Sequence, residues 1–187
     1  RYAAADLFVL PSQHEGYGMV VNEALVHGLP VVASRAGALA QIGPYAGSSG
    51  GFTFSGSSST MALSQLYVGV RGNASFLMAS GATANLSSQL IVGYFDTVAS
   101  ASFVQNGGTI NVPSTFIGVD GHASFEQSAG SHLVSGTLYL AYGPGGSGSY
   151  TLGNGTLSTN STYVGRAGSG SFVQDGGTHT IANTLLL

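Results

Sequence analysis

The octapeptide Ser102-Phe-Val-Gln-Asn-Gly-Gly-Thr109 returns with a single change as Ser171-Phe-Val-Gln-Asp-Gly-Gly-Thr178. Weaker copies occur elsewhere, and each carries an aromatic residue at the second position: Phe52, Phe76, Phe103, Phe125, Tyr150 and Phe172. Consecutive aromatics are 24, 27, 22, 25 and 22 residues apart. Self-similarity at a nearly constant period indicates a chain built from stacked structural repeats.

A series of glycines marks the same units. Each follows a Val, Ile or Tyr, and together they lie 22 to 26 residues apart: Gly43, Gly69, Gly93, Gly118, Gly143 and Gly165. Between the glycines, apolar and polar residues alternate in short runs such as Ala101–Gln105, which is typical of β-strands. No helical periodicity persists through a unit, and 30 glycines are too many for helices.

Two or three strands in each unit make one coil of a parallel β-solenoid. The sequence therefore predicts a mainly β fold of about six coils of 22–26 residues. We expect the aromatic residues to stack in a column inside the solenoid and the glycines to lie at its corners.

The composition changes between Gly37 and Gly43. Residues 1–37 hold five of the eleven charged residues, whereas the rest of the chain holds 26 of the 30 glycines. We therefore expect two parts, a partial α/β domain at residues 1–40 and the solenoid at residues 41–187.

The overall composition excludes several classes of function. The chain of 187 residues has a net charge of −3, four arginines, no lysine and no cysteine. It offers no basic surface for nucleic acid and no thiol chemistry. No run of about 18 apolar residues occurs, so we expect no membrane insertion.

Residues 1–37 follow the pattern of an α/β unit. Asp6–Leu10 and Val31–Ser34 are predicted buried strands, and Met19–His27 is a predicted helix between them. A strand, a helix and a parallel strand make one right-handed crossover of a Rossmann-like domain. Ligands of such sheets bind at the carboxyl ends of the strands, which here means the loop at residues 12–18.

That loop suits an anionic sugar ligand. Gly16 and Gly18 allow close approach of the backbone, and amides at the predicted helix start carry partial positive charge that suits a diphosphate. The carboxylates of Glu15 and Glu23 can accept hydrogen bonds from sugar hydroxyls.

The stretch Ala5–Ser34 resembles the donor-binding core of family 4 (group 1) retaining glycosyltransferases, which have the GT-B fold and a Glu-x7-Glu motif. Glu15 and Glu23 match that motif. The resemblance implies that Glu15 meets the donor sugar hydroxyls and that Glu23 holds the nucleotide ribose. It also implies that the backbone of Gly16, Tyr17 and Gly18 lies against the sugar and phosphates.

The resemblance covers about 37 residues and implies no catalytic residue, cofactor or metal ligand in this chain. The basic residues that neutralise the leaving diphosphate in the family lie upstream of the matched stretch, and its acceptor domain has no counterpart here. The first hypothesis is therefore an inactive fragment of a nucleotide-sugar transferase, and whether the chain is an enzyme stays open.

Residues 41–187 resemble the Gly/Ser/Thr-rich repeats of bacterial autotransporter-like surface proteins. This resemblance implies the alternative function, a structural or adhesive segment of a secreted protein with no enzymatic role. The transferase resemblance implies the cytoplasm and the repeat resemblance implies the cell surface, so the localisation stays open. A chimera from gene fusion, contig assembly or design, with no evolved joint function, is a third interpretation.

The sequence argues against a phosphate-binding or metal-binding site within the repeats. Gly143–Gly148 has the glycines of a phosphate loop, but Pro144 interrupts it and no helix is expected after it, so we interpret it as a corner. His132 and His179 share a repeat position with Ile110, which argues against a metal-ligand position. The stretch Leu185–Leu187 carries no polar cap, so we expect a truncated last coil and self-association through its open edge.

Overall fold

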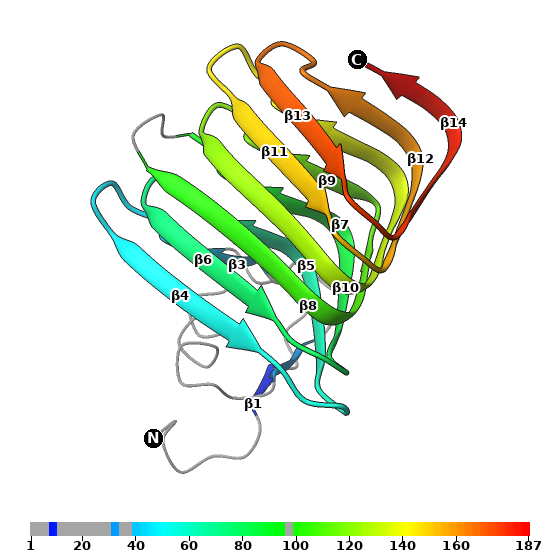
Figure 1. Ribbon diagram of the computed structural model, residues 1–187. Helices are drawn as coiled ribbons and strands as arrows, with labels where there is room; N and C mark the ends of the chain where they lie inside the picture. Colours follow the sequence, from blue (N-terminus) through cyan, green and yellow to red (C-terminus); the bar gives the residue numbers. More distant parts are fainter. Residues whose placement is uncertain (1–7, 11–30, 34–38, 96–98) are drawn as a thin grey trace.

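The computed structural model describes residues 8–10, 31–33, 39–95 and 99–187, and every regular element in these ranges is a β-strand. Twelve of the strands wind into one solenoid (Figure 1). The bounds are β1 Phe8–Leu10, β2 Val31–Ala33, β3 Leu39–Ile42, β4 Ser49–Phe54, β5 Thr60–Val68, β6 Asn73–Met78, β7 Thr83–Val92, β8 Ser100–Val112, β9 Ser114–Ile117, β10 His122–Leu140, β11 Ser147–Leu152, β12 Thr156–Val164, β13 Ser169–Gln174 and β14 Thr178–Leu186.

Each coil contributes a strand segment to three faces. In one coil these segments are residues 100–105 on the first face, 109–112 on the second and 114–117 on the third. Every pairing between neighbouring coils is parallel, and residues at the same repeat position lie next to each other. The predicted parallel β-solenoid of about six coils is thereby confirmed.

The repeat aromatics form one column inside the solenoid. Phe103 stacks on Phe76 and on Phe125, with 4.6 Å between ring centroids in both pairs. Phe125 stacks on Tyr150 at 4.7 Å. These spacings match the separation of about 4.8 Å between hydrogen-bonded strands. The column confirms the interior position predicted for the repeat aromatics.

The glutamine of the octapeptide closes the turn that follows it. Gln105, Gln127 and Gln174 each donate from Nε2 to the carbonyl oxygen of the residue three positions later, at 3.0 to 3.3 Å. Each of these acceptors is a glycine with positive φ: Gly108, Gly130 and Gly177. The motif therefore fixes both the strand and the corner after it.

A second corner confirms the role of the repeat glycines and corrects one of them. Gly43, Gly69, Gly93, Gly118 and Gly165 all have φ between 64° and 77°. In the fifth unit this corner falls on Ala141, with φ 57°, and not on Gly143. The register explains the shift, because Leu140 pairs with Ile117 and places Ala141 next to Gly118. Gly143–Gly146 forms the turn that follows.

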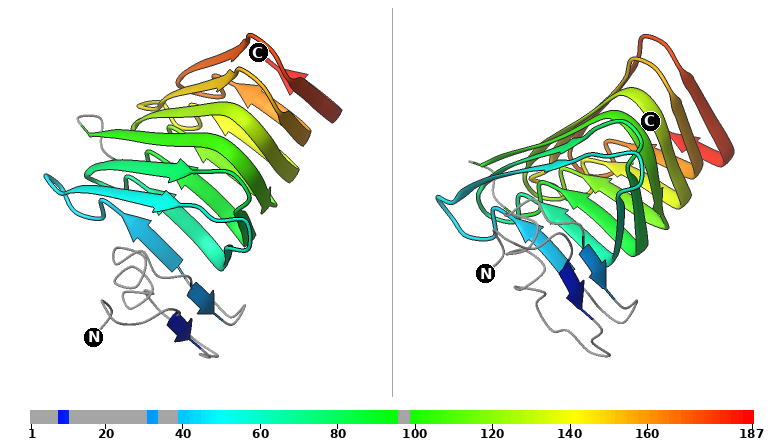
Figure 2. Two further views of the ribbon diagram at one scale, coloured as in Figure 1. Left: turned by 60° about the horizontal axis from the view of Figure 1, so that its bottom comes forward. Right: turned by 90° about the horizontal axis from the view of Figure 1, so that it is seen from below.

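The strands β1 and β2 form a separate parallel pair, with Phe8 opposite Val31 and Leu10 opposite Ala33. Parallel pairing is what a crossover requires, and the helix expected at residues 19–27 lies outside the described residues. The pair lies at the N-terminal end of the solenoid, opposite the end that carries the C-terminus (Figure 2), and β2 lies against β5. Among the described residues, no helix has the length and hydropathy to span a bilayer.

Candidate functional site

The residues expected to bind a nucleotide-sugar lie outside the described residues: Glu15, Gly16, Tyr17, Gly18 and Glu23. The structure does describe the frame on which they depend. Because β1 and β2 are parallel, their carboxyl ends, at Leu10 and Ala33, lie at the same edge. Ligands of parallel sheets bind at that edge.

Within the solenoid, the strongest concentration of chemical groups is a buried network around His132. Its Nε2 lies 3.0 Å from Oγ1 of Thr115, and its Nδ1 lies 3.2 Å from the hydroxyl of Tyr150. The Tyr150 hydroxyl in turn donates to Oε1 of Gln127 at 2.6 Å. All four side chains are buried.

The directions of these bonds fix the protonation of the imidazole. Because the Tyr150 hydroxyl gives its proton to Gln127, it accepts from Nδ1–H of His132, and Nε2 is left to accept from Thr115. Burial lowers the pKa of His132 to about 3 and raises the pKa of Tyr150, so both groups are neutral at pH 7. Both nitrogens of His132 and the hydroxyl of Tyr150 thus have hydrogen-bond partners within the protein, and the network stabilises the packed core.

The register tests the sequence argument about the two histidines. His132 pairs with Ile110 on one side and with Leu157 on the other, and Leu157 pairs with His179. The shared repeat position is confirmed, and it points into the core. In the described part of the chain, no three His, Asp or Glu side chains gather where they could hold a metal ion.

An aromatic ladder on the outside of the third face was not predicted from the sequence. Phe116 stacks on Tyr139 at 4.9 Å, Tyr139 stacks on Tyr163 at 5.3 Å, and Tyr142 meets Tyr139 edge to face at 5.1 Å. The guanidinium of Arg166 covers the ring of Tyr142 at 4.3 Å. A signal was present, because an aromatic or isoleucine stands two residues before each corner from the second coil onward.

The stacked rings face one another along the solenoid axis, with interplanar angles of 15° and 26°. Tyr139 therefore has a stacked ring on each side, whereas Phe116 and Tyr163 each stack on Tyr139 alone. A ladder of this kind stabilises contacts between coils, as cross-strand aromatic pairs do in other sheets.

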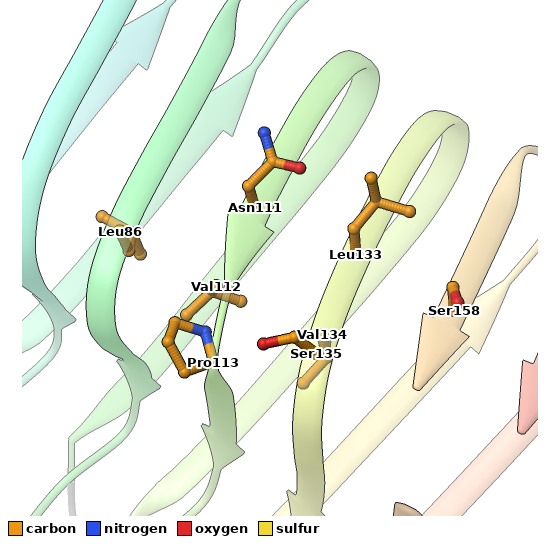
Figure 3. Close-up of a pocket in the computed structure, with 8 residues that line it drawn as sticks. All are labelled: Leu86, Asn111, Val112, Pro113, Leu133, Val134, Ser135 and Ser158. Atoms are coloured by element: carbon orange, nitrogen blue, oxygen red, sulfur yellow. The ribbon is translucent and has the colours of Figure 1, made fainter. Parts of the chain in front are cut away.

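The surface of the described residues includes two shallow grooves. One, of about 310 Å³, runs beside the corner after the second face, where Asn111, Leu133 and Ser158 line it (Figure 3). Its lining has no titratable side chain. The other, of about 240 Å³, lies among serines of the first face, with His122 at its edge. Neither groove brings together an acid and a base.

The N-terminal part of the chain is similar in sequence to known glycosyltransferases. The family described as "Glycosyl transferases group 1" matches residues 1–65. That range covers the β1–β2 unit and also runs into β5, in the first coils of the solenoid. The family likeness therefore overlaps the repeat region without extending through it.

Three curated relatives are all sugar transferases. A sulfoquinovosyl transferase of Arabidopsis thaliana is 56% identical over 43 residues, which is 23% of this chain and 8% of the relative. A D-inositol 3-phosphate glycosyltransferase of Corynebacterium kroppenstedtii is 53% identical over 38 residues, 20% of this chain and 8% of the relative. A lipopolysaccharide core biosynthesis mannosyltransferase of Rhizobium meliloti is 46% identical over 41 residues, 22% of this chain and 12% of the relative.

The chain thus spans between 8% and 12% of the length of these relatives. No solved structure matches it. The comparisons support a glycosyl-transfer fragment at the N-terminal end of the chain.

Proposed function

We propose that the N-terminal part of this chain is the nucleotide-sugar-binding segment of a retaining GT-B glycosyltransferase. The observation that carries the proposal is the group 1 glycosyltransferase match over residues 1–65, which contains both glutamates of the Glu-x7-Glu motif. The parallel pairing of β1 and β2 supports it, since a donor site of this type requires that frame.

Each candidate residue has a distinct role in this proposal. Glu15 accepts hydrogen bonds from hydroxyls of the donor sugar, and Glu23 accepts them from the ribose. The backbone of Gly16, Tyr17 and Gly18 lies against the sugar and the diphosphate. Two acceptor groups and a short run of amides bind weakly, because the chain lacks lysine to pair with the diphosphate.

The same composition supports inactivity of the chain by itself. The leaving diphosphate of a donor sugar needs neutralising cations, and only Arg1 and Arg35 lie in the N-terminal part. We therefore expect donor binding without transfer.

Titration calorimetry with UDP- and GDP-sugars tests this proposal. We expect saturable binding in the millimolar range that weakens at least about tenfold in Glu15→Ala and Glu23→Ala. Glu126→Ala is the matched control, because Glu126 is exposed on the first face of the solenoid and should leave binding unchanged. Absence of saturable binding by the unsubstituted chain overturns the proposal.

A structural or adhesive role of the solenoid is the second candidate. Outward positions of the first face carry serine in five successive coils: Ser75, Ser102, Ser124, Ser149 and Ser171. A uniform surface of small hydroxyls with few charges suits a scaffold better than a reaction site. Its resemblance to autotransporter-like repeats is consistent with that role.

Hydrogen exchange separates the two roles. Saturating nucleotide-sugar should slow exchange within residues 1–38 and leave residues 39–187 unchanged. Protection spread over the solenoid faces would contradict a purely structural role for the repeats. If the chimera arose by contig assembly, sequencing of transcripts across codons 30–50 should fail to recover a continuous message, whereas a gene fusion should give one.

A further inference from the structure

The chain contains the dipeptide Asn-Gly twice, as Asn106–Gly107 and as Asn154–Gly155. In this dipeptide the backbone nitrogen of the glycine can attack Cγ of the asparagine side chain and close a five-membered succinimide ring. Glycine favours the reaction, because no Cβ restricts its backbone from adopting the conformation that the ring needs. How fast the ring closes then depends on how near the structure holds the nitrogen to the side chain.

The corner at Asn154–Gly155 holds the reacting groups close together. The pair lies between β11 and β12, and the backbone nitrogen of Gly155 lies 2.8 Å from Oδ1 of Asn154. Because Oδ1 is bonded to Cγ, this hydrogen bond folds the carboxamide back over the peptide bond that follows it. The Asn154 side chain is also exposed, so water reaches it. The corner therefore keeps the attacking nitrogen and its target carbon in proximity.

In the described part of the chain, the backbone hydrogen bonds between coils do not use this nitrogen. The N–H groups of Gly153 and Asn154 both donate to the carbonyl oxygen of Gln127, at 2.9 and 3.3 Å. Parallel pairing with the preceding coil resumes at Thr156. Between them, the N–H of Gly155 donates to the side chain of the residue before it. Loss of the proton from Gly155 therefore costs no hydrogen bond between coils.

The second copy, Asn106–Gly107, has a different geometry. Both residues belong to β8, and Oδ1 of Asn106 accepts a hydrogen bond from Oγ of Ser128 in the next coil at 2.7 Å. That bond ties the carboxamide to the neighbouring coil rather than to Gly107. The two copies thus share a sequence and differ in geometry, which makes Asn106 an internal reference for Asn154.

We propose that Asn154 is a site of spontaneous deamidation. The nitrogen of Gly155 loses its proton to solvent base and forms a bond with Cγ of Asn154. The bond between Cγ and the carboxamide nitrogen breaks, and that nitrogen takes up a proton and leaves as ammonia. Water then adds to either carbonyl carbon of the succinimide and cleaves its bond to the ring nitrogen, which leaves aspartate or isoaspartate at this position. The steps together exchange water for ammonia, with no oxidation or reduction.

The reaction changes both the charge and the main chain of the corner. The new carboxylate adds one negative charge at neutral pH. Isoaspartate also lengthens the main chain by one carbon before Thr156, whose carbonyl oxygen accepts a hydrogen bond from Nε2 of Gln127 at 3.1 Å. Deamidation therefore acts next to a side-chain contact that joins two coils.

Incubation of the folded chain in mildly alkaline buffer, followed by peptide mass mapping, tests the proposal. We expect the peptide with Asn154 to exchange ammonia for water at least about tenfold faster than the peptide with Asn106. In guanidinium chloride both geometries are lost, so the two rates should become similar. Equal rates in the folded chain, or an unchanged Asn154, overturn the proposal. A difference that persists in guanidinium chloride overturns it too, because the sequence rather than the corner would then set the rate.

Two variants assign the mass change to its residue. Asn154→Gln keeps a carboxamide but would need a six-membered ring, so it should abolish the mass change in this peptide. Asn106→Gln is the matched control and should leave the rate at Asn154 unchanged. Both positions are exposed, so neither substitution should disturb the fold. A mass change that persists at this corner in Asn154→Gln would contradict the assignment.

Discussion

Ala141 lies directly beside Gly118 at the same corner of the solenoid and shares its left-handed backbone, with φ 57° against 71°. The backbone N–H groups of both residues donate equivalent hydrogen bonds to the preceding coil. Gly118 donates to the carbonyl oxygen of Val92 at 2.7 Å, and Ala141 donates to that of Ile117 at 2.9 Å. The corner therefore imposes the left-handed conformation, and Ala141 adopts this conformation although its Cβ makes it unfavourable.

Replacing Ala141 by glycine should stabilise the protein. The left-handed conformation costs a non-glycine residue about 1–2 kcal/mol, and the added chain entropy of glycine offsets part of this gain. We expect Ala141→Gly to raise the free energy of unfolding by about 0.5–1 kcal/mol, measured by urea denaturation.

The reverse change at Gly118 is the control for that prediction. A Cβ at Gly118 would overlap the carbonyl oxygen of Ser147. Gly118→Ala should therefore lower the free energy of unfolding by about 2 kcal/mol or more. A less stable Ala141→Gly variant would show that the methyl group of Ala141 matters more than its backbone conformation.

Stability should fall in acid because of His132. Burial lowers the pKa of its imidazole to about 3 in the folded chain, while an unfolded histidine has a pKa of about 6.5. The unfolded state therefore binds more protons between these values. The contribution of neutral His132 to the free energy of unfolding is therefore complete above pH 6.5. It is lost as the pH falls toward 3, by about 1.4 kcal/mol for each pH unit.

Urea denaturation at several pH values from 7.5 to 4 measures this slope. His132→Ile should reduce this slope, because the substitution removes the titratable imidazole. Isoleucine suits the site, since it already occupies the same inward position at residue 110. Equal slopes in the unsubstituted chain and in His132→Ile would contradict the assignment.

Replacing Gln127 should lower the free energy of unfolding, because the buried Tyr150 hydroxyl loses the acceptor of its proton. Gln127→Leu suits the column sterically, because Leu152 occupies the same position one coil later. It nevertheless takes the acceptor from the Tyr150 hydroxyl and two bonds from backbone carbonyls. We expect a loss of about 2–3 kcal/mol in the free energy of unfolding, measured by urea denaturation.

A double-mutant cycle separates the hydroxyl from the rest of that loss. In Gln127→Leu combined with Tyr150→Phe, no buried hydroxyl remains without an acceptor for its proton. The double variant should therefore be more stable than the sum of the two single losses predicts, by about 1 kcal/mol. Simple additivity would show that the bond between these side chains contributes little.

The sequence predicted the solenoid because each coil repeats a steric requirement. An aromatic fills the interior, a glutamine closes the turn after it, and a left-handed corner follows the third face, as Phe103, Gln105 and Gly118 illustrate. The period indicated the roles of the aromatic and the glycine, whereas the role of Gln105 is seen only in the structure. The fifth corner lies two residues before the predicted Gly143, because the backbone there tolerates Ala141 in place of glycine.

The hydrogen-bond network could not be predicted, because it joins residues from different coils. His132 meets Thr115 of the preceding coil and Tyr150 of the following one, and their contacts depend on how the faces pack inside the solenoid. The outer ladder was accessible in principle, since Tyr139 and Tyr163 precede their corners by two residues. The donor-site residues, including Glu15 and Glu23, remain predictions from motif and likeness.

The outer aromatic ladder should contribute to stability even though it lies on the surface. Tyr139 stacks on Phe116 and Tyr163 and meets the edge of Tyr142, so its loss removes three ring contacts. Each pair of this kind contributes about 0.5–1 kcal/mol. Tyr139→Ser should lower the free energy of unfolding by about 1.5–3 kcal/mol in urea denaturation. Tyr45→Ser is the matched control, since 71% of Tyr45 is accessible and its loss should change stability little. A loss in Tyr139→Ser no larger than in the control would mean that the stacked rings pack together without holding the coils to one another.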